Sequence, residues 1–325
     1  MAPSMRVLVT GATGFLGRHL CRRLASAGNT LTILRRVTST AGALGDIEVR
    51  HEIGEITDPA CVKAATRGQE VVIHAAACLS SRSGVRAIQH QVNVAGTQNV
   101  VNGCLQNGVN RLVHVSSVAA IGIPRDNTPA NEDFCFNLRE SSLHYYVSKH
   151  EAECVVARGV SRGLDAVIVN PTGIWGPAGS YYRGAEIVET VRRNRVLRYS
   201  SGGVCIVHVD DVIDGLLAAL DHGVTGNRYI LGGDNLTFRQ LMEKAAAAIT
   251  VNPWFVRVPN AVMSCAARIA ESSNALLGDC FANAYASYYC ANRFSYYDST
   301  KARLSLGFRA RTFDAILKEC LTFTP

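Results

Sequence analysis

The chain has 325 residues, of which 48% are hydrophobic and 18% charged, so it can bury a sizeable core and is not intrinsically disordered. No apolar run approaches the roughly 18 residues that a membrane-spanning helix needs, and the short N-terminus leaves no room for a signal peptide. The net charge of +7 comes from dispersed Lys and Arg residues, a pattern more typical of solvated helix faces than of a nucleic-acid site. We therefore expect a cytoplasmic protein without a membrane span or a nucleic-acid partner.

The cysteines do not form a recognisable framework. There are 11 of them, an odd number, scattered from Cys21 to Cys320, and no pair has the C-x-x-C spacing. We interpret them as reduced and mostly buried side chains. No cluster of Cys and His has the spacing of metal ligands, so no metal site is expected.

The first half of the chain alternates short apolar runs with longer helical segments. Six strands are predicted, in chain order Arg6–Thr10, Thr30–Leu34, Val49–Glu52, Val71–His74, Arg111–Val115 and Asp165–Val169. Helices are predicted between them, over Phe15–Ala27, Pro59–Arg67, Ile88–Asn107 and Ser142–Ser161. Short apolar strands separated by helices indicate an α/β fold of the Rossmann type, a doubly wound parallel sheet that binds its ligand at the carboxyl ends of the strands.

The pattern loosens after Pro171, where Gly, Pro and Tyr become frequent. The elements predicted here are a strand, a helix and a strand over Ile206–Val209, Asp211–Leu220 and Tyr229–Leu231, and the chain from about Pro253 is expected to be helical and loop-like. We predict a dinucleotide-binding domain over residues 1–172 and a smaller substrate-binding lobe over residues 173–325. The lobe should be interleaved, with residues from about 204 to 232 returning to the first domain.

A glycine triad follows the first predicted strand and opens the first predicted helix. It reads Gly11-x-x-Gly14-x-x-Gly17. Glycines at such a place permit a tight turn and let backbone N–H groups approach a pyrophosphate, which the helix N-terminus also attracts. In this setting the triad predicts a dinucleotide site, whereas a plain glycine-rich turn is the alternative.

Two arginines, Arg35 and Arg36, stand at the end of the second predicted strand. Sites that prefer NAD usually place a carboxylate there for the ribose 2′-hydroxyl. Guanidinium groups suit a 2′-phosphate instead, because they offer fork-like donors to phosphate oxygens. We predict NADP as the cofactor and leave NAD open, the alternative being that both arginines are solvated surface residues.

Tyr145 and Lys149 are four residues apart, so they share one face of a predicted helix. An ammonium near a phenol lowers the tyrosine pKa from about 10, so that the tyrosine can exchange a proton with a carbonyl or alcohol oxygen near neutral pH. Tyr146 lacks this spacing. Ser116 and Ser117 follow the fifth strand, where a hydroxyl can either hydrogen-bond the substrate oxygen or simply cap the strand end.

Six motifs in one order resemble the extended short-chain dehydrogenase/reductases, the NAD-dependent epimerase/dehydratase group, which implies that the chain is an enzyme. They are Gly11-x-x-Gly14-x-x-Gly17, His74-Ala75-Ala76-Ala77, Asn93-Val94-x-Gly96-Thr97, Ser116-Ser117, Tyr145-x-x-x-Lys149 and Pro171-Thr172-x-x-x-Gly176-Pro177. The likeness spans roughly Met5 to Leu231. It also makes a homodimer plausible.

The resemblance implies a role for each matching residue. The pyrophosphate would be held by Gly11, Thr13, Gly14, Phe15, Leu16 and Gly17, and the adenosine would lie beside Arg35, Arg36, Glu55 and Ile56, with Glu55 a mild departure from the family's usual Asp. The nicotinamide half would contact Ala75, Ala76, Ala77, Ser116, Pro171 and Thr172. Ser117 would polarise the substrate oxygen, Tyr145 would be the acid/base, and Lys149 would orient the nicotinamide ribose and tune Tyr145. His74 is expected to be a packing residue.

The run from Asn170 to Pro177 is similar to the dihydroflavonol 4-reductase and 3β-hydroxysteroid dehydrogenase branches, because nucleotide-sugar members often carry Asn where this chain has Gly173. The second lobe also contributes several aromatic residues, which suit either a planar, apolar substrate or ordinary packing: Trp175, Tyr181, Tyr182, Tyr285, Tyr288 and Tyr289. We predict an NADP(H)-dependent oxidoreductase that interconverts a ketone and a secondary alcohol on a hydrophobic small molecule. The alternatives are a nucleotide-sugar epimerase or dehydratase, and a non-catalytic relative that senses cofactor or binds nucleic acid.

Overall fold

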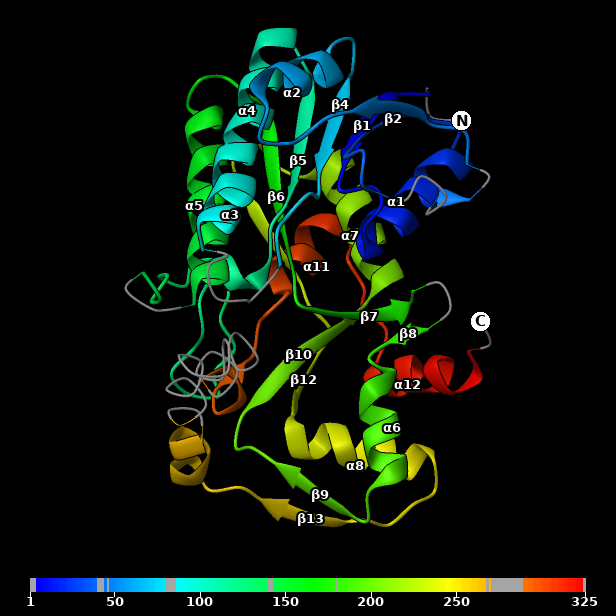
Figure 1. Ribbon diagram of the computed structural model, residues 1–325, viewed down its shortest axis with the longest axis vertical. Helices are drawn as coiled ribbons and strands as arrows, with labels where there is room; N and C mark the ends of the chain where they lie inside the picture. Colours follow the sequence, from blue (N-terminus) through cyan, green and yellow to red (C-terminus); the bar gives the residue numbers. More distant parts are fainter. Residues whose placement is uncertain are drawn as a thin grey trace.

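A seven-stranded parallel sheet forms the upper part of the molecule (Figure 1). The computed structural model describes residues 4–39, 44–45, 47–79, 86–139, 143–178, 181–266, 269 and 289–323. The sheet has the order β11-β6-β5-β4-β1-β2-β3, and its strands are β1 (Arg6–Thr10), β2 (Thr30–Arg35), β3 (Arg50–Ile53), β4 (Val71–His74), β5 (Arg111–Val115), β6 (Ala166–Pro171) and β11 (Arg228–Leu231). Every pairing is parallel, which confirms the predicted doubly wound fold.

Helices cover both faces of this sheet (Figure 1). One face packs against α1 (Phe15–Ser26) and α7 (Val209–His222), and the other against α2 (Pro59–Thr66), α4 (Gly96–Asn107) and α5 (His144–Val160). Alternate strand residues point to opposite faces, so Val7 and Val9 of β1 join the first core while Leu8 joins the second. This double burial explains why the central strands are continuously apolar.

The predicted helix Ile88–Asn107 is interrupted. It consists of α3 (Arg86–Gln89), a π-helical segment over His90–Ala95, and α4. The π-helical segment carries Asn93, whose side chain bonds the Cys78 backbone at 2.7 and 3.2 Å, a tie that the apolar periodicity alone does not encode. Such wide turns inside helices are frequent at functional sites.

A second sheet lies below the first (Figure 1). Its path runs β12-β10-β7-β8, with β14 beside β10, and the strands are β7 (Gly173–Pro177), β8 (Tyr182–Arg183), β10 (Gly203–His208), β12 (Asp234–Thr237) and β14 (Phe294–Ser295). A separate pair joins β9 (Val196–Tyr199) to β13 (Trp254–Arg257), so the segment after Pro253 opens on a strand and the prediction of helix and loop was wrong there. Further helices are α6 (Ala185–Arg193), α8 (Phe238–Ala248), α11 (Thr300–Leu306) and α12 (Phe313–Thr322).

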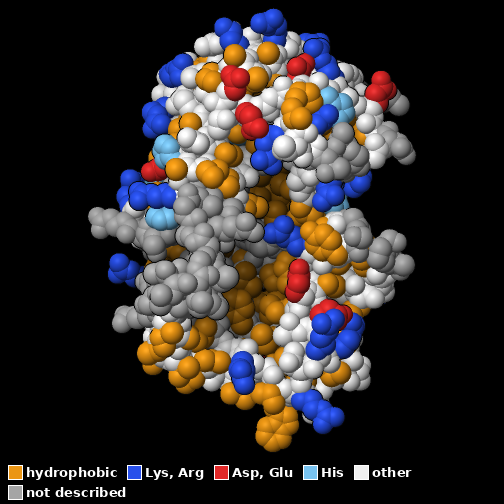
Figure 2. Space-filling view, in the orientation of Figure 1, with side chains coloured by type: hydrophobic (Ala, Val, Ile, Leu, Met, Phe, Trp, Pro, Cys, Tyr) orange, Lys and Arg blue, Asp and Glu red, His pale blue; other side chains and the backbone are white. Residues whose placement is uncertain are grey.

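The chain passes more than once between the two sheets. β10 belongs to the second sheet, α7 then packs beside α1, β11 completes the first sheet, and β12 returns to the second. Figure 2 shows a hollow between the two halves in which hydrophobic side chains gather. Within the described residues, no helix combines the length and apolarity needed to cross a bilayer.

Candidate active site

The glycine turn between β1 and α1 is shaped to receive an anion. Gly11 has φ +75°, and a Cβ there would lie 2.6 Å from the Ala75 backbone carbon, while a Cβ on Gly17 would overlap the Gly11 carbonyl oxygen. α1 begins at Phe15 with Gly14 as its cap, no side chain caps its N–H groups, and no acidic residue lies in its first turn. Free N–H groups and the positive end of the helix dipole therefore fit a pyrophosphate.

The next strand end places the two arginines predicted to face the adenosine. Arg35 ends β2, and its Nε donates to His51 Nδ1 at 2.8 Å, while Arg36 is exposed. Ile56 is buried and Glu55 exposed. Arg35 is the last residue of β2, and the other three residues follow β2 or β3. All four therefore lie at the carboxyl edge of the sheet, where a parallel sheet binds its ligand.

His74, at the end of β4, is held on both sides of its ring. Its Nδ1 lies 2.7 Å from Thr10 Oγ1 and its Nε2 lies 3.0 Å from Thr97 Oγ1. The Thr10 hydroxyl also accepts from the Ala76 N–H at 3.3 Å. Burial, and then the charge of Lys149, lower the pKa of His74 to about 3, so the ring is neutral and fixes the turn that follows β4.

The structure brings Ser117, Tyr145 and Lys149 together at the carboxyl end of β5. Ser117, just after β5, and Tyr145, in the first turn of α5, are neighbours, and the Ser117 hydroxyl acts to lower the pKa of the Tyr145 phenol. Ser117 Oγ also accepts from the Ala119 N–H at 3.2 Å. Lys149 lies one helical turn after Tyr145, is only 2% exposed, and donates from Nζ to the Val115 carbonyl at 3.0 Å.

The protonation of this group differs from the expectation. Burial raises the pKa of Tyr145, opposed by its hydrogen bond to Ser117 and by the charge of Arg183, so the predicted lowering by Lys149 was wrong for this structure. The reason is that the Lys149 ammonium is directed at Val115, and burial lowers its own pKa to about 8. The Tyr145 phenol is consequently protonated at neutral pH and can serve as a proton donor.

Tyr146 lies in a different environment from its neighbour. Its hydroxyl is 3.5 Å from Cys290 Sγ, and burial raises its pKa well above the ordinary value. The two rings meet edge to face, with centroids 6.2 Å apart. Tyr146 therefore packs toward Cys290 and provides a natural control for Tyr145.

Several residues behind the site were not singled out as site residues. Asn170 Nδ2 donates to the Ser117 carbonyl at 2.9 Å and to Glu153 Oε1 at 2.5 Å. Arg228 pairs with the same Glu153 at 3.2 Å. Glu153 lies four residues after Lys149, so its spacing on the helix could have indicated it. Asn93 donates to Ser148 Oγ at 3.0 Å. It belongs to the motif Asn93-Val94-x-Gly96-Thr97, for which the sequence predicted no role.

The remaining residues predicted to contact the nicotinamide half line the nearby strand ends. Ala75, Ala76 and Ala77 follow β4 and are half-buried. Pro171 and Thr172 follow at the end of β6 and are buried. Ser116 is 7% exposed, and its Oγ has no hydrogen-bond partner among the described residues. A buried hydroxyl without a partner beside a ligand site is a candidate for a ligand contact.

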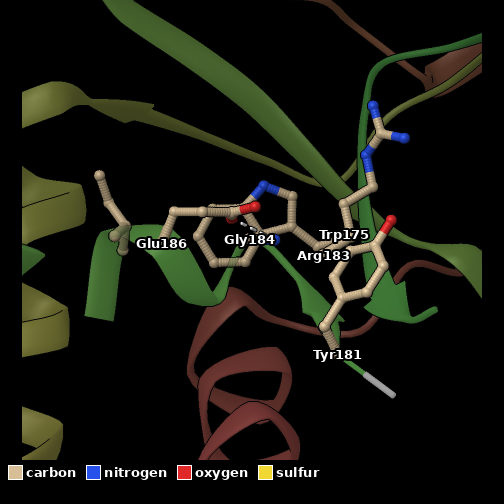
Figure 3. A pocket seen from close by; sticks show the side chains of 6 residues that line it. Trp175, Tyr181, Arg183, Gly184 and Glu186 are labelled. Atoms are coloured by element: carbon tan, nitrogen blue, oxygen red, sulfur yellow. Dashed lines mark hydrogen bonds between the residues drawn. The ribbon is translucent and has the colours of Figure 1, made fainter. Parts of the chain in front are cut away.

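The lobe side of the site contains a cavity of about 380 Å³ (Figure 3). Its lining residues are Trp175, Tyr181, Arg183, Gly184, Glu186 and Ile187. Of the other aromatic residues that the sequence suggested, Tyr182 is buried in the lobe core and Tyr289 packs under Arg293. Tyr285 and Tyr288 lie outside the described residues.

The described cysteines and acidic residues offer no metal centre. No group of three or more His, Cys, Asp or Glu side chains in the described part of the chain could hold a metal ion. The ten cysteines that the structure describes are free thiols.

The fold and the ordered motifs define an enzyme of the extended short-chain dehydrogenase/reductase class. The model of the NAD dependent epimerase/dehydratase family matches residues 7–232, and the chain belongs to this family. A nicotinamide dinucleotide is accordingly its class of cofactor, and the protein is an NAD(P)-dependent oxidoreductase.

Named relatives agree with this class. The chain is 34% identical to sterol demethylase protein B of Methylococcus capsulatus, over 74% of this chain and 73% of that protein. It is 28% identical to a 4-hydroxy-2-methyl-3-oxo-4-farnesyl-3,4-dihydroquinoline-1-oxide ketoreductase of Stigmatella aurantiaca, over 94% and 92% of the two chains. The crystal structure of gox2253 superimposes with a TM-score of 0.83 at 29% identity, covering 98% of this chain and 97% of the other.

Proposed function

We propose that the protein is an NADP(H)-dependent oxidoreductase that interconverts a ketone and a secondary alcohol on a hydrophobic small molecule. The observation that carries the proposal is that Ser117 and Tyr145 lie close together beside a buried Lys149 at the carboxyl end of β5. Two neighbouring hydroxyls can both reach one substrate oxygen. A carbonyl oxygen needs such donors as it gains negative charge.

The residues would divide the work as follows. The bound cofactor supplies or accepts the hydride. The Ser117 hydroxyl donates a hydrogen bond to the carbonyl oxygen and fixes its position. Tyr145, protonated at neutral pH because burial raises its pKa, gives its proton to that oxygen during reduction and takes it back during oxidation. Lys149, whose ammonium donates to the Val115 carbonyl, would orient the nicotinamide ribose.

A hydrophobic substrate is supported by the hollow between the two halves, where apolar side chains gather (Figure 2). The cavity walls include the rings of Trp175 and Tyr181. The named relatives are a sterol demethylase protein and a ketoreductase of a farnesylated ring, both enzymes of large apolar molecules by their names. An aromatic-walled cavity of this kind suits such molecules.

The residue at position 173 disfavours a nucleotide-sugar substrate. A Cβ on Gly173 would lie 3.0 Å from the Cys205 carbonyl oxygen of the adjacent strand β10. An Asn at this position, as nucleotide-sugar members often have, would need the strand to shift. Several solved structures of nucleotide-sugar enzymes share the fold, but at 20–24% identity they are evidence for the fold alone.

The direct test follows nicotinamide absorbance with a panel of ketones, secondary alcohols and nucleotide sugars. We expect turnover of apolar ketones or alcohols. Tyr145→Phe keeps the ring and removes the proton, so it should lower kcat by roughly 10²–10⁴-fold with folding intact. Tyr146→Phe is the matched control and should do far less. Near-normal turnover by Tyr145→Phe would reject its role, and no turnover across the panel would favour the non-catalytic alternative.

Nucleotide sugars provide a second prediction. Calorimetry of the cofactor-loaded enzyme with UDP- and dTDP-sugars should give no micromolar binding, because Gly173 offers no side chain to hold them. The positive control is titration of the cofactor itself. A clear micromolar isotherm with either sugar nucleotide would move the assignment to an epimerase or dehydratase.

A further inference from the structure

Arg183 lies between the nucleotide turn and the proposed proton donor. It is on β8, paired with Gly176 of β7, and its guanidinium carbon is 5.2 Å from the centre of the Phe15 ring. Phe15 is the first residue of α1, directly after the glycine turn. The charge of Arg183 also reaches the Tyr145 phenol, where it favours the phenolate. β7, with which β8 pairs, follows directly after Thr172 at the carboxyl end of β6, so a group bound by Arg183 would lie between the cofactor turn and the end of the sheet where the reacting oxygen is expected.

The cavity around Arg183 has one apolar wall and one cation. The Trp175 indole is fixed by the edge of Phe313, with ring centroids 5.3 Å apart, and by Gly184, where any Cβ would overlap the indole. Figure 3 shows Arg183 and Tyr181 on one side of the indole and Glu186 extending from the other. The indole face can hold an apolar group while Arg183 points away from it.

The charge of Arg183 lies over the Phe15 ring but has no carboxylate partner in the part of the chain that the structure describes. Glu186, the one carboxylate among the described lining residues, accepts from the Gly184 N–H at 2.9 Å and makes no ion pair with Arg183. By contrast, Arg192 on the following helix pairs with Glu189. A guanidinium that faces a cavity without a counter-ion is suited to bind an oxyanion through two parallel hydrogen bonds.

We propose that Arg183 binds an oxyanion beside the reacting carbon, and that this oxyanion is a carboxylate of the substrate. The inference rests on the proposed function and narrows its substrate class to hydrophobic 3-oxo and 3-hydroxy acids, in which a carboxylate lies two bonds from the carbonyl or carbinol carbon. The carboxylate is unchanged by the reaction: hydride transfer occurs at the carbonyl carbon, and the proton moves between Tyr145 and the carbonyl oxygen. The apolar part of the acid would lie against Trp175. The same guanidinium chemistry could instead serve the cofactor's phosphates, since Phe15 adjoins that turn.

The test compares an acid with its ester. Calorimetry measures binding of 3-hydroxydecanoate and of methyl 3-hydroxydecanoate to the full-length protein saturated with reduced cofactor, a combination that cannot turn over. We expect the wild type to bind the acid about tenfold or more tightly than the ester, the scale of a charge-assisted contact. Arg183→Gln should abolish that difference by weakening the acid alone. Arg193 is an exposed arginine on α6 that pairs with Glu189 at 3.5 Å. Arg193→Gln is the matched control and should change neither the affinity for the acid nor that for the ester.

Titration of reduced cofactor into the same variants separates the two sources of oxyanion. Arg183→Gln could instead weaken cofactor binding about tenfold and leave the affinities for the acid and for the ester unchanged. In that case Arg183 binds the cofactor phosphates, and its proposed role with the substrate carboxylate is rejected. If Arg183→Gln changes neither cofactor nor acid binding, or if neither acid nor ester binds, the proposal is overturned. Failure of the proposed function is distinct, because it would appear as absent ketone or alcohol turnover while the selective loss of acid binding persisted.

Discussion

Two histidines lie side by side on neighbouring strands, but only one has hydrogen-bond partners. His74 and His114 are paired in the β4–β5 register, with ring centroids 5.2 Å apart. Both nitrogens of His74 meet threonine hydroxyls, whereas both nitrogens of His114 are buried without a partner among the described residues. Leaving a buried polar atom unpaired typically costs about 1–3 kcal/mol, so His114 destabilises the fold at this position.

His114→Leu should therefore stabilise the protein, by about 1 kcal/mol or more at neutral pH, in denaturant unfolding. His74→Leu is the matched control and should destabilise it, because it leaves two buried hydroxyls without their partner. A loss of stability in His114→Leu would contradict the prediction. It would mean that the packing contacts of His114 stabilise the fold by more than its unpaired nitrogens destabilise it.

The pH dependence of the same variant has a definite sign. Burial, and then the charge of Lys149, hold the pKa of His114 well below 6.5 in the folded state. The unfolded chain takes up that proton below about pH 6.5, so the wild type loses stability as pH falls, by roughly 1.4 kcal/mol per unit. The gain from His114→Leu should grow between about pH 7.5 and about pH 5.5. A gain that does not change with pH would show that His114 does not carry this penalty.

At the scale of elements, the turn after β2 should decide between the two nicotinamide dinucleotides. Arg35 donates from Nε to His51, and its NH1 lies 3.4 Å from the Ser39 carbonyl oxygen, whereas Arg36 is exposed and its side chain makes no hydrogen bond within the described residues. The wild type should favour NADPH in kcat/KM. Each charge-assisted contact contributes roughly 1.5–3 kcal/mol, and even one contact would give about tenfold preference.

Substitution of each arginine tests this preference. At least one of Arg35→Ala and Arg36→Ala should erode the NADPH preference, with the larger effect expected at Arg36, whose donors are not already engaged by the turn. Arg50→Ala, on the adjacent strand and paired with Glu52 at 2.8 Å, is the control. Equal use of NADPH and NADH by the wild type, or no effect of either substitution, would show that these arginines are surface charges only.

The strands of the first sheet could be predicted from sequence to within two residues, because most of them are short apolar runs; β3, with the sequence Arg-His-Glu-Ile, is the exception. β7, β8, β9, β12, β13 and β14 could not, since they are two to five residues long and half-exposed or rich in Gly and polar residues, so their pairing is decided by tertiary contacts. The π-helical segment was missed for a related reason: the polar contacts of Asn93, not apolar spacing, determine it.

In the candidate site, too, local sequence motifs were predictable and contacts between separate elements were not. Ser117, Tyr145 and Lys149 were found from spacing and order, because motifs on one helix or one strand end are local features. Arg183 was not found, since its place opposite Phe15 depends on the hairpin of β7 and β8. The direction of the Lys149 ammonium was not found either, because Val115 lies on a different element. The individual roles of these residues stay predictions until the substitutions above are measured.

At the scale of the whole molecule, one arginine joins the two halves. Arg311 precedes α12 and binds Asp211 of α7 from Nε at 3.0 Å and from NH2 at 2.9 Å, and it also pairs with Glu319. The Asp211 side chain is only 7% exposed. Since α7 packs on the first sheet and α12 on the second, this ion pair ties the lobe to the dinucleotide-binding part. We retain the division at residues 172 and 173 as a proposal for two interleaved units.

Arg311→Met should leave the Asp211 carboxylate buried without its cation. We expect a loss of about 3–5 kcal/mol in the free energy of unfolding, the usual scale for breaking a buried ion pair. Arg303→Met is the control, because Arg303 is exposed and its nitrogen lies 3.8 Å from Asp298, so it should cost no more than about 1 kcal/mol. Similar losses in the two variants would show that the tie between the halves does not depend on Arg311.

The interleaved path has a consequence for the order in which the chain is synthesised. β6 is complete at residue 171, and all six of its residues are buried, but the strand that covers its outer edge, β11, begins only at Arg228. Until those later residues leave the ribosome, the nascent chain presents an apolar strand edge that can pair with other chains. Ribosome-bound chains that end before β11 should therefore bind chaperones or aggregate. Chains that extend beyond β11 should do neither.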